Sequence, residues 1–275
     1  MGTLRFKQVD VFTSRPFFGN PVAVVIGAEG LDTEAMQRIA CWTNLSETTF
    51  LLPSKVADYR LRIFTPRQEL PFAGHPTIGS AHAALESGLV SRKPLLRQEC
   101  GAGILDLALE GDGRIYVKGP PAKIAAAPAI PGVPTLGERL RIDVGPTWVV
   151  GEMADARALA HLAPDMASLA DYSDEQQASG VTLFAKSDDC VAAIHVRSFA
   201  PAHGIPEDPV CGSGNLSVGV FLKQHDPSLT RFGKTYVARQ GGALGRDGRV
   251  HVHLDEDGIR IGGHAVTCVD GQLTV

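Results

Sequence analysis

The sequence lacks the cysteine pattern of disulfide-stabilised secreted proteins and of structural zinc sites, and it lacks the basic clusters of nucleic-acid-binding proteins. Its five cysteines are odd in number, scattered over 275 residues and never spaced as CxxC, so we expect neither a disulfide framework nor a structural zinc site. A reducing, cytoplasmic location is the matching expectation. Lysine and arginine together number 26 against 30 aspartates and glutamates, and no basic cluster lies beside aromatic residues. We therefore expect no nucleic-acid partner.

Long apolar runs are also missing. The opening stretch MGTLRFKQVD contains no apolar leader segment, and no window reaches the ~18 apolar residues that a membrane span needs. We therefore expect no membrane partner. Hydrophobic residues still make up 44% of the chain and charged residues 20%, which is ordinary for a globular protein of one large or two small domains.

Short strands, helices and turns alternate along the chain, because 30 glycines and 18 prolines interrupt the apolar patterns. In the first half we expect strands on either side of a turn at 15–21, a helix within 31–44, strands at 48–53 and 57–66, a helix at 75–90 and a hairpin at 103–119. In the second half we expect strands at 147–153, 181–186 and 190–201, a helix at 215–225, and hairpin strands at 235–242 and 249–263. The order strand, strand, helix, hairpin therefore occurs twice.

The helix within 31–44 has a clear start. Asp32 or Thr33 is the expected N-cap, and Ala35, Ile39 and Trp42 recur at helical spacing. Within 75–90 the signals of a second helix are Pro76 in its first turn and Gly88 just past its end.

The two halves predict two lobes. We expect an N-terminal lobe over 1–120 that includes the C-terminal strand 264–275, and a C-terminal lobe over 121–263. The Pro/Gly-rich stretch 129–137 has the composition of a connector between lobes.

One turn is written twice in the sequence. LPFAGHPTIGS (70–80) and DPVCGSGNLSV (208–218) align at a constant offset, with Gly74 over Gly212 and His75 over Ser213. Upstream of them, LRIFTP also matches VRSFAP. Such a repeat predicts approximate two-fold symmetry, with both turns lining one cleft. The alternative is a pair of similar strand-to-helix corners that never meet.

A glycine-rich turn that opens a helix can hold an anion. Its unpaired backbone N–H groups and the positive end of the helix dipole both favour negative charge. We therefore expect Gly74 and Gly212 to supply backbone donors to a carboxylate. The alternative is that both glycines only permit tight turns. Fingerprints for dinucleotides and for a P-loop are not matched by these segments.

The segment NLSETTFLL carries a carboxylate at an unusual place. Glu47 lies between a helix end and an apolar strand, where partial desolvation would raise its pKa toward neutrality, as a general acid/base requires. An exposed loop glutamate is the alternative. Aligning VTLFAK with ETTFLL puts Val181 at the position of Glu47, so only one lobe supplies this group.

Four motifs together resemble the PhzF-like (phenazine biosynthesis) isomerases, which share the diaminopimelate epimerase fold. They are DVFTSRPFFGNPVAVV, NLSETTFLL, FTPRQELPFAGHPTIG and PEDPVCGSGN, in that order over nearly the whole chain. The resemblance implies an α+β fold of two pseudo-symmetric lobes, each a curled, mostly antiparallel sheet around a central helix, with a catalytic cleft between the lobes.

The resemblance also implies site residues and partners. Its catalytic set corresponds here to Glu47, His75, Asp208 and Ser213, with substrate contacts at Gly74, Gly212, Cys211 and Gly214. It implies no metal, no organic cofactor, a small-molecule carboxylate substrate and a homodimer. From the residues themselves, His251 and His253 share one face of a strand, but no third ligand is evident, so a metal site is not expected there.

The two turns differ where epimerases and racemases of this fold carry paired cysteines. Here Cys211 occupies the second turn while Ala73 occupies the first, so inversion by two thiols is unavailable. We expect Glu47 to remove a proton and return it elsewhere, which is an isomerisation. PhzF-like members more often carry a small residue or threonine where Cys211 stands, and we interpret this cysteine as a packed free thiol. The alternatives are a racemase or epimerase that uses Glu47 and Cys211, or an inactive carboxylate-binding protein.

Overall fold

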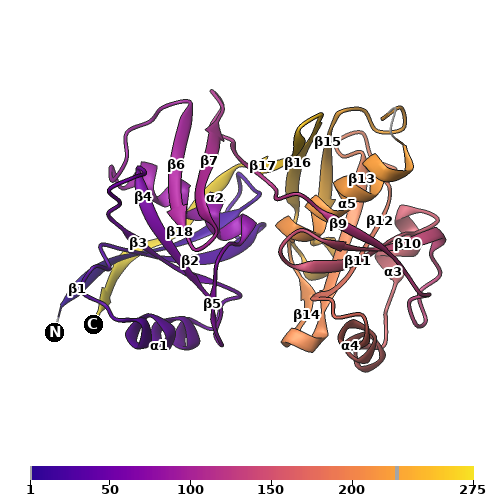
Figure 1. The fold of residues 1–275 in the computed structure, drawn as a ribbon, viewed down its shortest axis with the longest axis horizontal. Helices are drawn as coiled ribbons and strands as arrows, with labels where there is room; N and C mark the ends of the chain where they lie inside the picture. Colours follow the sequence, from indigo (N-terminus) through magenta and orange to yellow (C-terminus); the bar gives the residue numbers. More distant parts are fainter. Residues whose placement is uncertain (1, 227–228) are drawn as a thin grey trace. The chain divides into compact units, whose positions relative to one another are not determined.

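The computed structural model describes residues 2–226 and 229–275 and divides into two compact units (Figure 1). Unit 1 comprises the chain up to Lys118 together with Gly262–Val275, and unit 2 comprises Gly119–Ile261. Each unit combines a mixed, mostly antiparallel sheet with a few helices. The expected α+β fold with two repeated halves is confirmed.

Unit 1 is built around one long helix, α2. Its elements are β1 (Thr3–Val11), β2 (Asn20–Ile26), α1 (Thr33–Thr43), β3 (Thr48–Leu52), β4 (Tyr59–Phe64), β5 (Glu69–Leu70), α2 (Gly74–Glu86), β6 (Leu95–Cys100), β7 (Gly103–Leu109), β8 (Ile115–Lys118) and β18 (Ala265–Thr274). The C-terminal strand β18 pairs antiparallel with β1.

Unit 2 repeats this plan around α5, with two helices, α3 and α4, at the place where unit 1 has α1. Its elements are β9 (Lys123–Ala127), β10 (Leu136–Asp143), β11 (Thr147–Glu152), α3 (Ala156–His161), α4 (Met166–Glu175), β12 (Gly180–Lys186), β13 (Ile194–Ala200), β14 (Ile205–Asp208), α5 (Gly212–His225), β15 (Thr235–Gln240), β16 (Gly248–Asp255) and β17 (Gly258–Gly263), with 3₁₀ turns at Pro201–His203 and Gly242–Leu244.

The two units share one pairing scheme. In unit 1, β2 runs parallel to β3, β3 antiparallel to β4, and β4 parallel to β6. In unit 2, β11 runs parallel to β12, β12 antiparallel to β13, and β13 parallel to β15. In each unit the long helix lies in the chain just before the strand that completes the parallel pair. The sequence repeat therefore corresponds to a repeat of architecture.

The strand register corrects one predicted alignment. Thr48 pairs with Phe64, and Val181 pairs with Phe199. Because Phe64 and Phe199 occupy matching places in the repeat, Val181 corresponds to Thr48, and Gly180 rather than Val181 stands where Glu47 does. The prediction was wrong by one residue because it matched apolar side chains instead of ladder partners.

Helix α2 lies close against the strands of unit 1 because Gly79 has no side chain. A Cβ at Gly79 would lie 2.5 Å from Cγ1 of Val22 and 2.9 Å from Cγ2 of Val11. The hydroxyl of Thr49 on β3 also bonds the hydroxyl of Ser80 on α2, at 2.8 Å. These contacts fix where the first turn of α2 begins relative to β2 and β3.

Several local predictions need correction. The helix expected within 31–44 is present as α1; its buried residues are Met36 and Ala40, Ile39 packs against the same core, and Trp42 is 75% exposed. The connector 129–137 lies inside unit 2, because β9 before it pairs with β10 after it. The strand expected from residue 190 begins at Ile194, and the helix expected from residue 215 begins at Gly212.

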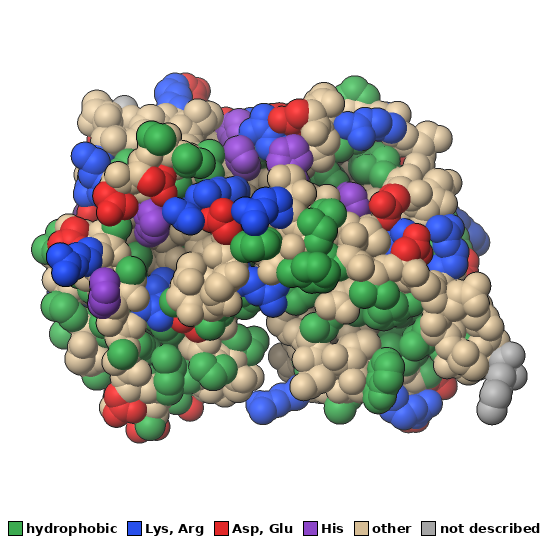
Figure 2. Space-filling model, turned by 180° about the vertical axis from the view of Figure 1, so that it is seen from behind, with side chains coloured by type: hydrophobic (Ala, Val, Ile, Leu, Met, Phe, Trp, Pro, Cys, Tyr) green, Lys and Arg blue, Asp and Glu red, His purple; other side chains and the backbone are tan. Residues whose placement is uncertain are grey.

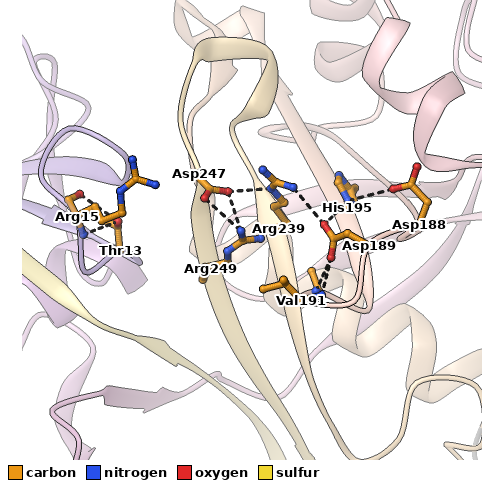
Figure 3. Close-up of polar contacts among 10 residues, drawn as sticks. Thr13, Arg15, Asp188, Asp189, Val191, His195, Arg239, Asp247 and Arg249 are labelled. Atoms are coloured by element: carbon orange, nitrogen blue, oxygen red, sulfur yellow. Dashed lines mark hydrogen bonds and ion pairs between the residues drawn. The ribbon is translucent and has the colours of Figure 1, made fainter.

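On the face drawn in Figure 2, side chains of both charges are scattered among hydrophobic and uncharged groups. One ion-pair network in unit 2 pins the turn before β13. Asp189 accepts from the backbone N–H groups of Val191 and Ala192, both at 2.8 Å, and from Nη1 of Arg239 at 3.1 Å (Figure 3). Arg239 in turn donates to Asp247 at 2.8 Å. In the part of the chain that the structure describes, no helix is long and apolar enough to span a bilayer.

Candidate active site

Glu47 is held at the entrance to strand β3. Helix α1 ends at Asn44, which takes a left-handed backbone conformation with φ 53° and turns the chain back toward the sheet. The carbonyl of Glu47 accepts from the N–H of Ala23 on β2 at 3.4 Å, and β3 starts at the next residue. The glutamate therefore follows a helix end and precedes a buried strand, as the sequence predicted.

The carboxylate of Glu47 meets the imidazole of His75 from α2. Oε2 of Glu47 lies 3.2 Å from Nε2 of His75, and the two side chains are 16% and 6% exposed. Burial raises the pKa of Glu47 to about 7, and a hydrogen bond from Ser46 opposes this shift. At neutral pH this carboxyl group can therefore both accept and donate a proton.

The first turn of α2 carries no side-chain cap. Ala73 is the N-cap residue and makes no side-chain hydrogen bond, while its carbonyl accepts from the N–H of Thr77 at 3.2 Å. Pro76 has no N–H to offer. Gly74 and His75 therefore supply the earliest backbone donors of a thirteen-residue helix, where the helix dipole favours an anion.

The matching turn in unit 2 is capped by sulfur. Cys211 is the N-cap of α5, and its Sγ accepts from the N–H of Gly214 at 3.2 Å. Burial raises the pKa of the Cys211 thiol well above its usual range, and the charge of Asp208 adds to the shift. The thiol is therefore neutral at physiological pH and serves as a helix cap.

Ser213 lies in the same turn and is oriented by an indole. Nε1 of Trp148 donates to Oγ of Ser213 at 2.9 Å, and Sγ of Cys211 lies 3.6 Å from the same oxygen. Because an indole N–H can only donate, Ser213 accepts from Trp148 and keeps its own hydrogen for another acceptor.

Gly214 has a packing role in addition to its bond with sulfur. A Cβ at this position would lie 2.6 Å from Oγ of Ser198 and 2.8 Å from Oγ1 of Thr182, two hydroxyls that bond each other at 3.0 Å. The absence of a side chain lets α5 begin directly against β12 and β13. The N–H of Gly214 donates to Sγ of Cys211, so the other early backbone donors of this turn are those of Gly212 and Ser213.

The structure brings the expected site residues together in two groups. Glu47, Gly74 and His75 form one group in unit 1, and Asp208, Cys211, Gly212, Ser213 and Gly214 form the other in unit 2. Sequence reasoning missed Trp148 and Gln240, both of which bond the second group. Neither stands in a motif, and only the strand register could have indicated them.

No metal centre emerges among the described residues 2–226 and 229–275, where no three or more His, Cys, Asp or Glu side chains are arranged to hold an ion. His251 and His253 lie on β16 as expected, on its partly exposed face.

Two units with one pairing scheme, each opening a long helix on a glycine turn, define a duplicated α+β fold. The sequence profile of the family described as "Phenazine biosynthesis-like protein" matches residues 9–133 and 134–271, one match for each half. The chain therefore belongs to the phenazine biosynthesis-like family, known as PhzF.

Individual relatives agree with this assignment. The chain is 39% identical to "Antisense-enhancing sequence 1" of Schizosaccharomyces pombe, with 97% of each chain covered. It is 36% identical to trans-2,3-dihydro-3-hydroxyanthranilate isomerase of Pseudomonas aeruginosa, over 94% of this chain and 92% of that protein. The crystal structure of a PhzF-family phenazine biosynthesis protein from Bacillus anthracis superposes with a TM-score of 0.85 at 27% identity, with both chains fully covered.

Proposed function

We propose that this protein is a cofactor-independent isomerase that moves a proton within a small carboxylate or amino-acid-like substrate, with Glu47 as the general acid/base. The observation that carries the proposal is the pair of Glu47 and His75, 3.2 Å apart, in which burial raises the pKa of the glutamate to about 7. A relative that is 36% identical is named as an isomerase of trans-2,3-dihydro-3-hydroxyanthranilate, which is itself a carboxylate.

The chemistry that we propose is balanced without a co-reactant. The Glu47 carboxylate takes a proton from one carbon, and the electron pair left behind shifts along an adjoining double bond. The resulting Glu47 carboxylic acid then returns the same proton to a second carbon. One C–H bond breaks and another forms, and no group is oxidised or reduced.

The remaining residues bind and orient in this proposal. The imidazole of His75 lies 3.2 Å from the Glu47 carboxyl group, and we assign it the role of orienting that group. Backbone N–H groups of Gly74 and Gly212, each the first residue of its helix, are proposed to bind substrate anions. Ser213 offers its hydroxyl hydrogen, which Trp148 leaves available.

Asp208 and Cys211 complete the set. We assign Asp208 to the polar lining, where it lies beside the Cys211 thiol and raises the pKa of that thiol. The N–H of Gly214 donates to Sγ of Cys211, so we propose that Gly214 contacts the substrate through its Cα. We further propose that the chain acts as a homodimer, which light scattering coupled to gel filtration would test.

A racemase or epimerase that uses Glu47 and Cys211 is the second candidate. It is favoured by the presence of a thiol at the start of α5 and disfavoured by the neutral, capping state of that thiol. A binding protein without chemistry is a third candidate, and the raised pKa of Glu47 argues against it, since binding an anion gains nothing from a proton-carrying carboxyl group.

The experiment follows substrate protons in D₂O by NMR. Trans-2,3-dihydro-3-hydroxyanthranilate is tested first, followed by a panel of small unsaturated amino and hydroxy carboxylates. We expect a double-bond shift with less than one full deuterium per turnover, lost in Glu47→Gln. Inversion at a single carbon with full deuterium uptake and dependence on Cys211 would establish the epimerase, and binding without exchange would establish the binding protein.

A further inference from the structure

One buried side chain that was not predicted as a site residue, Gln240, makes hydrogen bonds to the segment that carries Asp208 and Cys211. Gln240 ends β15 and is 1% exposed. Its Oε1 accepts from the backbone N–H of Cys211 at 3.1 Å and from Nδ2 of Asn215 at 2.8 Å. Its Nε2 donates to the backbone carbonyl of Asp208 at 3.0 Å. A single carboxamide therefore ties the end of β14 to the first turn of α5.

These partners fix the orientation of the carboxamide. The carbonyl of Asp208 can only accept a hydrogen bond, and the N–H of Cys211 can only donate one. Exchanging the oxygen and nitrogen of Gln240 would face acceptor with acceptor and donor with donor. An ionised glutamate in this place would lack the donor, and a methionine would lack the donor and offer only a weak acceptor.

The backbone beside Gln240 also lies close to the turn that precedes α5. Gly241 has φ 95°, which favours glycine, and a Cβ there would lie 2.5 Å from the carbonyl oxygen of Pro209. The end of β15 therefore packs directly on the turn at 209–211. Because this turn is closely packed, it cannot easily move to replace the Gln240 hydrogen bonds when they are lost.

We propose that Gln240 is a positioning residue for the reaction, because its carboxamide sets the places of Asp208, Cys211 and Ser213. It does so through the backbone of the turn, without touching the reacting atoms. The proposal rests on the proposed function in one respect, since it treats Asp208 and Ser213 as substrate-facing groups.

Unit 1 provides a matched control. Gln98 on β6 is fully buried, donates from Nε2 to the hydroxyl of Thr77 at 3.2 Å, and accepts from the hydroxyl of Tyr59 at 3.0 Å. Changing Gln98 to glutamate introduces the same buried carboxyl group next to α2. This change lies in unit 1, whereas the turn at 208–213 belongs to unit 2.

The test measures how readily Cys211 reacts with iodoacetamide, read peptide by peptide by mass spectrometry. Cys211 is buried, so its alkylation requires local opening, while the exposed Cys41 and Cys190 report the reagent itself. In Gln240→Glu at about pH 8 we expect alkylation of Cys211 about 10-fold or more faster than in the unaltered protein, because a buried acceptor–acceptor contact replaces a hydrogen bond. Near pH 6 the ratio should return toward one, because the protonated acid donates again to Asp208.

Gln98→Glu should leave the alkylation ratio at Cys211 near one at both pH values. A ratio near one for Gln240→Glu at both pH values, or an equal rise in both variants, would overturn the proposal. Turnover is the second readout: the kcat of Gln240→Glu, taken relative to the unaltered protein at the same pH, should recover toward one at low pH, while the ratio for Gln98→Glu should not. An opened Cys211 with unchanged kcat and KM would also overturn the positioning role. Full activity of Glu47→Gln would remove the proposed function yet leave the alkylation result intact.

Discussion

Nε2 of His75 lies 3.2 Å from Oε2 of Glu47, which joins the second residue of helix α2 to the residue before strand β3. This contact depends on α2 packing closely on the sheet, which Gly79 permits, and on the chain reversal at Asn44. A change in either place would separate the imidazole from the carboxyl group without altering either side chain.

The first prediction concerns turnover by Glu47→Gln. The amide keeps the shape of the side chain but cannot carry a proton, so we expect kcat to fall by about 10²–10⁴-fold. In the unaltered protein the pH–rate profile should contain a group titrating near pH 7, matching the pKa of about 7 for Glu47. The profile of the variant should lack this group, and a variant with near-normal rate would contradict the assignment.

The second prediction concerns stability and pH. Because the pKa of Glu47 is about 7 in the folded protein against 4.5 ordinarily, the folded state binds more protons than the unfolded state between these values. The contribution is fully present below pH 4.5 and is lost as pH rises to about 7, an upper limit of about 3 kcal/mol in the free energy of unfolding. Urea unfolding at several pH values would measure this loss.

Two variants complete that measurement. Glu47→Gln removes the titrating group, so its free energy of unfolding should fall less steeply over the same pH range. Glu34→Gln is the control, because the Glu34 side chain on α1 is 87% exposed and should leave the slope unchanged. Parallel slopes for Glu47→Gln and the unaltered protein would show that the carboxyl group is not desolvated.

The third prediction separates capping from catalysis at Cys211. Cys211→Ala removes the bond from the Gly214 N–H to sulfur, which should cost about 1 kcal/mol of stability, while most of the rate should remain. Cys211→Ser should regain the cap, because a hydroxyl accepts the same N–H. If Cys211→Ala instead loses as much rate as Glu47→Gln, a two-base mechanism holds.

The fourth prediction concerns the close approach of α5 to its sheet. In Gly214→Ala the new methyl group would crowd the hydroxyls of Ser198 and Thr182, so we expect a loss of about 1–3 kcal/mol in unfolding experiments. Gly30→Ala is the matched control, since nothing lies within 4 Å of a Cβ at that position. Equal stability of the two variants would mean that α5 can move away from β12 and β13 at little cost.

The repeated turns and Glu47 could be predicted because their signals are local. Proline and glycine mark the starts of α2 and α5, and a glutamate between a helix end and an apolar strand indicates partial burial. Trp148 and Gln240 could not be predicted, because they reach Ser213 and Cys211 from strands 65 and 29 residues away. Their contacts depend on strand register, which no short motif encodes.

Spacing predicts a helix but does not identify which of its residues are buried. The set Ala35, Ile39 and Trp42 marked α1 correctly, whereas its fully buried residues are Met36 and Ala40. The short helices α3 and α4 were not predicted. The wrong pairing of Val181 with Glu47 has the same origin, since a shift of one residue leaves an apolar strand pattern nearly unchanged while exchanging its faces.

Gly180, the glycine that stands where Glu47 does, keeps the two halves of this duplicated fold chemically unequal. A Cβ on Gly180 would overlap the carbonyl of Phe199 and lie 2.9 Å from the Trp148 ring. A carboxylate at position 180 would therefore require the neighbouring strand β13 to move. The backbone approach at Gly180 therefore limits the second half to a residue without a side chain at the place where the first half carries Glu47.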